Sequence, residues 1–164
     1  MESFSMSVKE WGLHTVLHRD LSVAEAGRLS ALLEDAAGGF IASGRRCNLI
    51  VDLRGTEAGH VHSPHVAALF AVLKRAEGAR CSLIVHGLPQ SAALERAALD
   101  RGLSAGLRVF AGDGRDRAAV AAAYKWALDG TEPCRPAKGE ILPFIAAATV
   151  RRAALPVQGL RRAS

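Results

Sequence analysis

The segment Cys47-Asn48-Leu49-Ile50-Val51-Asp52-Leu53-Arg54-Gly55 decides the fold of this 164-residue chain. It is a short, nearly continuous apolar run closed by a charged residue and a glycine, which is typical of a central β-strand covered on both faces. After a loop from Gly55 to His62, the pair Ser63-Pro64 places an N-cap residue before a proline at the first helical position. The sequence therefore predicts a buried strand that leads into a helix beginning at Ser63.

Further strands are predicted on both sides of this segment. Residues 80–87 (RCSLIVHG) indicate a second central strand, and residues 107–110 (LRVF) indicate the last one. Alternating apolar residues in segments 4–8 and 13–17 predict an N-terminal β-hairpin. With the helices between them, the elements follow the order ββαβαβαβα, which predicts an α/β fold with a mixed sheet of about five strands.

Four helices are predicted from apolar residues at helical spacing and from capping residues. The first opens with the capping box Ser22-Val23-Ala24-Glu25, and the pair Gly38-Gly39 together with Gly44 is expected to end it. The other helices are expected from Ser63 through Leu73, from the N-cap Ser91 to Gly102, and from Asp113 to Gly130.

Composition limits the class of protein. The length suits one compact domain with an appendage, and a content of 49% hydrophobic but 5% aromatic residues implies a core of Ala, Val, Leu and Ile. The three cysteines, Cys47, Cys81 and Cys134, are odd in number and widely spaced, so reduced thiols are expected. No apolar run is long enough to span a bilayer and the N-terminus does not resemble a signal peptide, so we expect a cytoplasmic location.

The C-terminal residues 131–164 differ in texture from residues 1–130, which predicts one domain followed by a basic, proline-interrupted tail. The net charge is +5, yet residues 1–130 carry 15 basic and 14 acidic side chains, so the predicted domain is close to neutral and no specific nucleic-acid binding is expected. The tail also has an apolar stretch from Ile141 to Val150, which is expected to pack on the domain or on a partner. That stretch, or an exposed sheet edge, offers a surface on which a homodimer could form.

The element order, and the stretch from Val51 to Gly55 followed by Ser63-Pro64-His65-Val66, resemble the STAS domain family of anti-sigma factor antagonists and sulfate-transporter tails, including its SpoIIAA-like members. The closing strand and the helix from Ala118 to Leu128 resemble the end of that domain, so the similarity covers about residues 4–129. The resemblance implies a regulatory module that is not an enzyme, needs no cofactor and binds a regulatory protein such as an anti-sigma factor or a kinase.

In that family, a serine or threonine at the start of the helix after the central strand is phosphorylated, and this releases the partner. The matching residue here is Ser63, so the resemblance implies a phosphosite at Ser63. The implied partner-binding surface consists of Asp52, Arg54, His62, Ser63 and His65. This sequence departs from the family pattern in the neighbours of Ser63, where His62 and Pro64 replace an acidic and a small residue. An ordinary N-cap, stabilising the helix by about 1 kcal/mol, is the alternative role of Ser63.

Two other functions stay open from the sequence. His60, His62 and His65 lie within six positions and could bind zinc or another divalent metal, which would make the chain a metal-dependent enzyme. The second alternative is a small-ligand or lipid-binding domain of the same fold, because alanine-rich helices leave room between helix and sheet.

Overall fold

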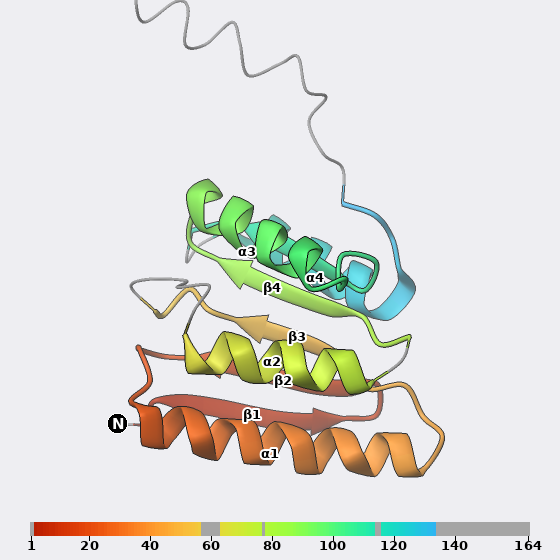
Figure 1. The fold of residues 1–164 in the computed structure, drawn as a ribbon. Coiled ribbons are helices and arrows are strands. Elements are labelled where there is room, and N and C mark those ends of the chain that lie inside the picture. The colour runs from red at the N-terminus through yellow and green to blue at the C-terminus, as the bar shows by residue number, and fades with distance from the viewer. Residues whose placement is uncertain (1, 57–62, 77, 114–115, 134–164) are drawn as a thin grey trace, which may run out of the picture. The chain divides into compact units, whose positions relative to one another are not determined.

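The computed structural model describes residues 2–56, 63–76, 78–113 and 116–133. Within these residues the strands and helices follow one another in the predicted order (Figure 1). Their bounds are β1 (Phe4–Lys9), β2 (Gly12–Leu17), α1 (Val23–Ala42), β3 (Asn48–Asp52), α2 (Pro64–Arg75), β4 (Cys81–Val85), α3 (Leu88–Asp100), β5 (Leu107–Ala111) and α4 (Arg117–Asp129). The predicted tail lies outside the described residues, apart from 131–133.

The five strands form one sheet in the spatial order β1-β2-β3-β4-β5. β1 and β2 form the predicted antiparallel hairpin, with Phe4 opposite Leu17. The pairs β2–β3, β3–β4 and β4–β5 are parallel. The prediction of an α/β fold with a mixed five-stranded sheet is therefore confirmed. Because the last four strands are parallel, their carboxyl ends share one edge of the sheet and their amino ends share the other.

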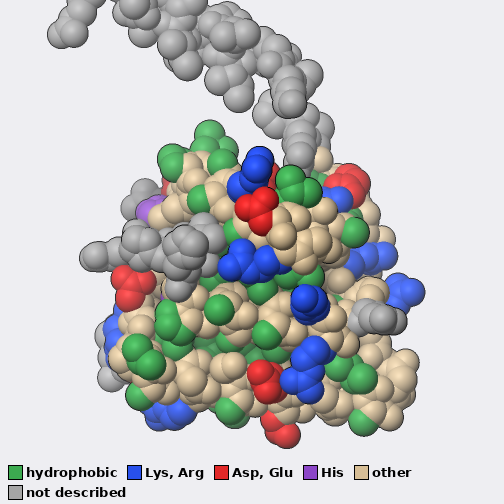
Figure 2. Space-filling model, in the orientation of Figure 1, with side chains coloured by type: hydrophobic (Ala, Val, Ile, Leu, Met, Phe, Trp, Pro, Cys, Tyr) green, Lys and Arg blue, Asp and Glu red, His purple; other side chains and the backbone are tan. Residues whose placement is uncertain are grey.

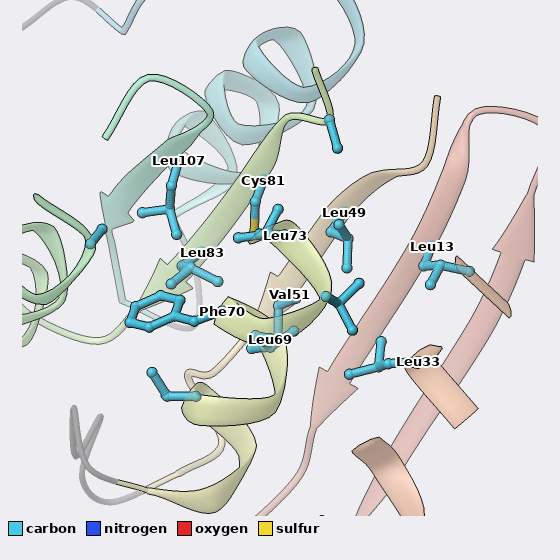
Figure 3. Packing of buried hydrophobic residues seen from close by; sticks show 14 of the residues in the cluster. Leu13, Leu33, Leu49, Val51, Leu69, Phe70, Leu73, Cys81, Leu83 and Leu107 are labelled. Carbon is cyan, nitrogen blue, oxygen red and sulfur yellow. The ribbon is translucent and has the colours of Figure 1, made fainter. Parts of the chain in front are cut away.

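The helices cover the two faces of the sheet unequally (Figure 1). α1, α2 and α3 pack on one face, where strand residues such as Leu49, Val51 and Leu83 meet Leu33 and Leu69 in the larger core (Figure 3). α4 packs on the opposite face of β3, β4 and β5 and forms a smaller core. The members of that smaller core are Ile50, Ile84, Phe110, Ala123, Trp126 and Ala127. β3 and β4 are thus buried on both faces, as their continuous apolar runs predict.

Helix α1 begins as predicted and ends just before Gly44, one of the glycines predicted to end it. The capping box is formed: the Glu25 amide donates to Ser22 Oγ at 3.3 Å, and the Ser22 amide donates to Glu25 Oε2 at 2.9 Å. α1 runs through Gly38-Gly39 to Ala42 and stops before Gly44, whose φ is +67°, so the expected end at Gly44 is confirmed, whereas the glycine pair does not end the helix. Its buried stripe includes Phe40, beyond the glycine pair, and the gain from burying that ring outweighs the low helix propensity of two glycines.

Helix α3 begins earlier than predicted. Its N-cap is Gly87, and Ser91 is a buried residue of the second turn whose amide donates to the Gly87 carbonyl at 3.1 Å. Pro89 occupies the first turn, where its missing N–H leaves no hydrogen bond unmade. The expectation that Ser91 caps this helix is therefore wrong, since the helix begins at Leu88 with Pro89 in its first turn, two residues before Ser91.

The two cysteines of the described residues lie in the core, as their apolar runs predict. Cys47 and Cys81 are free and buried in the larger core. Burial raises the pKa of the Cys47 thiol to about 11, and burial together with the nearby Cys47 also raises the pKa of Cys81. Both thiols are therefore protonated, poorly reactive core side chains. Cys134 lies outside the described residues.

The described surface mixes charges of both signs. On the face shown in Figure 2, Lys and Arg side chains are scattered among acidic and apolar groups. Exposed ion pairs such as Arg96–Asp100, with Nε and Oδ1 3.2 Å apart, belong to this mixture. None of the described helices is both long enough and apolar enough to cross a bilayer.

The positions of two glycines predict opposite changes in stability. Gly38 lies exposed within α1 and an added Cβ would touch nothing within 4 Å, so Gly38→Ala should raise the free energy of unfolding by about 0.5–1 kcal/mol. Gly12 has φ +144°, and a Cβ there would overlap the backbone of Asn48, so Gly12→Ala should lower it by about 2 kcal/mol or more. Urea denaturation measures both changes. A lower stability for Gly38→Ala would contradict the continuous α1.

Candidate functional site

An ion pair between Asp52 and Arg54 closes the carboxyl end of β3. Arg54 Nη2 lies 2.6 Å from Asp52 Oδ2, and Arg54 Nε lies 2.9 Å from Oδ1. The Arg54 amide also donates to Oδ1 at 3.0 Å. Both side chains are largely buried, with 12% of Asp52 and 16% of Arg54 exposed. The pair therefore forms a rigid, bidentate fork at the end of the strand.

Arg54 also connects β3 to the segment after β5. Its Nη1 donates to the carbonyl oxygen of Asp113 at 2.9 Å. The next residue, Gly55, passes so close to the end of β2 that an added Cβ would overlap the carbonyl oxygen of Leu17. The chain leaving β3 is thus held between the ends of two other strands.

The charge state of Asp52 follows from these contacts. Burial by itself would raise its pKa, but the hydrogen bonds and the positive charge of Arg54 outweigh burial and hold the pKa below its ordinary value. His14 acts in the same direction from β2. Asp52 is therefore ionised at neutral pH and serves as an anchor for Arg54.

Ser63 and His65 form a second pair at the start of α2. Ser63 Oγ lies 2.9 Å from His65 Nε2. Ser63 is half-buried, while His65 is only 3% exposed. The serine hydroxyl is thus held at the protein surface by an imidazole that is packed inside.

Ser63 occupies the N-cap position of α2, but its hydroxyl does not cap the helix. The backbone of Ser63 is extended, with φ −65° and ψ 144°, and Pro64 follows in the first turn, as predicted. The expected capping hydrogen bond is not formed, since the hydroxyl is directed to His65. The prediction of the helix start is confirmed, and the prediction of the hydroxyl's partner is wrong.

The predicted metal ligands are described only in part. His60 and His62 lie outside the described residues. His65 is buried at the start of α2 and contacts Ser63. Across the described part of the chain, no three His, Cys, Asp or Glu side chains come together in a way that could hold a metal ion. The three-histidine site stays a prediction.

Of the predicted surface residues, the structure brings together Asp52 with Arg54 and Ser63 with His65. Within the described residues, no hydrogen bond or ion pair joins one pair to the other. Both pairs flank the same connection, because β3 ends at Asp52 and α2 follows Ser63. The Asp52–Arg54 pair therefore precedes residues 55–62 in the chain, and the Ser63–His65 pair follows them.

A group on the other face of the sheet was not predicted. His14 of β2 faces α4, where its Nδ1 lies 3.5 Å from the hydroxyl of Tyr124, and the Trp11 ring meets Tyr124 edge-on at 6.0 Å between centroids. Burial lowers the pKa of His14 although Asp52 opposes that shift. Because side chains alternate along a strand, the sequence predicts that His14 lies on the opposite face of β2 from Leu13 and Thr15. Its contact with Tyr124 depends on which strands α4 packs against, and the sequence does not give that.

Asp52→Asn should lower the free energy of unfolding by about 3 kcal/mol at neutral pH, because it leaves the largely buried Arg54 without its carboxylate. The pKa of Asp52 is depressed in the folded state, so this contribution is complete above the ordinary value of 3.8 and is lost as the pH falls below it. Urea denaturation at neutral and acid pH measures the difference. Asp100→Asn is the matched control, because its ion pair with Arg96 is exposed and should contribute less than about 1 kcal/mol.

Ser63→Ala should lower the free energy of unfolding by about 1 kcal/mol, because it leaves the buried Nε2 of His65 without its hydroxyl partner, although no cap of α2 is lost. Ser22→Ala should lower it by about 1 kcal/mol, because Ser22 does cap α1. Thermal or urea denaturation of both variants provides the comparison. The loss for Ser63→Ala should disappear in a His65→Phe background, whereas the loss for Ser22→Ala should persist there. A loss for Ser63→Ala that persists in that background would contradict His65 as the partner of its hydroxyl.

The geometry of these two pairs is the basis for a functional proposal. Comparisons of this chain with family models, with curated proteins and with solved structures find no match. The resemblance to STAS domains consequently rests on the sequence pattern and the element order.

Proposed function

We propose that this chain is a non-enzymatic regulatory module with a STAS-like, SpoIIAA-like fold, which binds a partner protein and is switched by phosphorylation of Ser63. The binding surface would comprise Asp52, Arg54, Ser63 and His65, together with His62, which is outside the described residues. The partner would be a regulatory protein such as an anti-sigma factor or a kinase, as the family resemblance implies. A cytoplasmic location of the chain is part of the same proposal.

The observation that carries the proposal is the state of Ser63. Ser63 is half-buried rather than enclosed, and Pro64 beside it is exposed, so Ser63 lies at the protein surface. Because the hydroxyl does not cap α2, its modification would not remove a capping hydrogen bond. A kinase could therefore modify Ser63 without unfolding the helix.

A phosphate on Ser63 would be supported where it is attached. The amides of the first turn of α2 donate no hydrogen bond to the Ser63 side chain, and the positive end of the helix dipole favours an anion there. The imidazole of His65, now 2.9 Å from Oγ, is a further donor when protonated. Phosphorylation adds a charge of about −1.5 to −2 at neutral pH, which would repel a partner with an acidic contact surface.

The Asp52–Arg54 pair supports the same surface as a rigid element. Two hydrogen bonds to Asp52 and one to the Asp113 carbonyl immobilise the guanidinium. A side chain held in this way loses little conformational freedom when a partner binds. Arg54 would thus be the fixed contact of the proposed surface, and Ser63 the switchable one.

The test has two stages. The first incubates the purified chain with ATP and an extract of its source cells, and maps phosphorylation by mass spectrometry in wild type and Ser63→Ala. The second compares wild type, Ser63→Ala and Ser63→Glu as bait, identifies proteins retained by wild type, and measures the affinity of each purified candidate by calorimetry. Ser104→Glu is the matched control, because Ser104 is exposed in the turn before β5.

Ser63→Glu should weaken the affinity for the partner at least about tenfold, while Ser63→Ala and Ser104→Glu retain it. Phosphate at Ser63 in the wild-type chain, absent in Ser63→Ala, is the second expected result. Equal affinities for Ser63→Glu and Ser104→Glu would overturn the switch, and a partner that binds equally well to Asp52→Ala and Arg54→Ala variants would overturn the assigned surface.

A further inference from the structure

A pocket lies at the edge of the sheet opposite to Ser63. Its volume is about 300 Å³, at the lower end of the range of small-molecule sites. It is formed where the amino ends of β4 and β5 meet the turns after α2 and α3 and the last turns of α4. Arg46, Gly78 and Ala105 are exposed lining residues, so the pocket opens to solvent.

The backbone preforms this pocket. Gly78 and Gly102 each have φ +72°, a left-handed conformation that strongly favours glycine, and they shape the two turns that border it. Gly106 approaches the Ala79 carbonyl so closely that a Cβ would lie 2.8 Å from it. Most of the wall is therefore glycine and alanine, and no large side chain fills the space between the turns.

Two guanidinium groups line the pocket, from Arg46 and Arg80. Neither forms an ion pair with a carboxylate of the described residues. Arg80 Nη1 donates to the carbonyl oxygen of Leu128 at 3.0 Å, which uses one of its donors on the negative end of α4. The other N–H groups of Arg80, and the whole guanidinium of Arg46, remain available to an acceptor from outside the described residues.

Trp126 supplies an apolar wall. It is 5% exposed, and the Arg80 and Arg108 guanidinium carbons lie 5.9 and 4.3 Å from its ring centroid. Its indole N–H is buried and has no acceptor among the described residues. Leu73 and Leu103 extend the apolar lining. Among the described lining residues, the pocket thus combines an apolar body with more hydrogen-bond donors and positive charge than acceptors and negative charge.

We infer that this pocket binds a small organic oxyanion, a phosphomonoester or carboxylate attached to a compact apolar group, with Arg46 and Arg80 holding the anion. Guanidinium groups match the planar geometry of carboxylate and the oxygens of phosphate. The volume excludes a large ligand, and the apolar wall accounts for the organic part. The site is independent of the proposed switch, because it lies at the other edge of the sheet.

Titration of the full chain with phenyl phosphate, benzoate and phenol at constant ionic strength tests the inference. The readouts are the Trp126 indole N–H and the Gly78, Gly102 and Gly106 amide signals in nitrogen-15 NMR spectra, and Trp11→Phe assigns the indole signal. Both anions should shift these signals in a saturable way and phenol should not. Absence of saturable shifts with either anion, or equal shifts with phenol, would overturn the site.

Two variants separate charge from shape. Arg46→Gln should weaken phenyl phosphate binding about tenfold or more, and Ala105→Leu, which fills the mouth without changing charge, should weaken it similarly. Arg28→Gln on α1 is the matched control and should bind as wild type, because Arg28 is exposed and outside the pocket. An equal loss in Arg28→Gln and Arg46→Gln would reduce the effect to net charge and overturn the inference.

A last comparison distinguishes a soluble ligand from a lipid headgroup with the same phosphate chemistry. Phosphatidylcholine vesicles with phosphatidic acid should sediment the chain only if the headgroup is the ligand, and Arg46→Gln should then abolish sedimentation. Phenyl phosphate binding without sedimentation assigns the site to a soluble molecule. If wild type and Arg46→Gln sediment equally, the vesicles bind elsewhere on the chain, and the assignment of lipid binding to the pocket is wrong.

Discussion

The burial of β3 on both faces is the constraint on which the rest of the structure depends. Leu49 and Val51 point into the larger core, and Ile50 between them points into the smaller one, all at most 1% exposed. A strand without a solvent face needs helices on both sides and hydrogen-bonded neighbours at both edges. The parallel arrangement of β2 to β5 follows, since helices then connect each strand to the next across the sheet. Both proposed sites exist because this arrangement collects strand ends at two separate edges.

The two edges differ in the chemistry that they present. At the carboxyl edge, the carboxylate of Asp52 neutralises the charge of Arg54. At the amino edge, Arg46 and Arg80 meet glycine-rich turns and retain donors. The first edge carries the surface proposed to bind a partner protein, and the second carries the pocket proposed to bind a small anionic ligand.

The element order could be predicted because the strands are continuous apolar runs and the Ser22 capping box is a local signal. The errors arose where two local rules competed. Serine and proline signals both lie near the start of α3, and Pro89 determined where the helix begins. At Ser63, the hydroxyl had two nearby partners, the helix amides and His65, and local sequence cannot choose between them. The bond from Arg54 to the Asp113 carbonyl depends on the order of strands, so it could be found only in three dimensions. The same holds for Tyr124 above His14.

The turn between β1 and β2 has a kinetic consequence. Among the described strands, only these two pair with a neighbour that adjoins them in the chain, separated by Glu10 and Trp11. Every other pairing requires the closure of a long segment that contains a helix, and the entropy of closing such segments slows folding. The hairpin can therefore assemble within microseconds, while the remaining sheet has to wait for α1, α2 and α3 to bring distant strands together. During that interval the apolar strand β3 is unpaired, which makes the early chain most vulnerable to aggregation at its future centre.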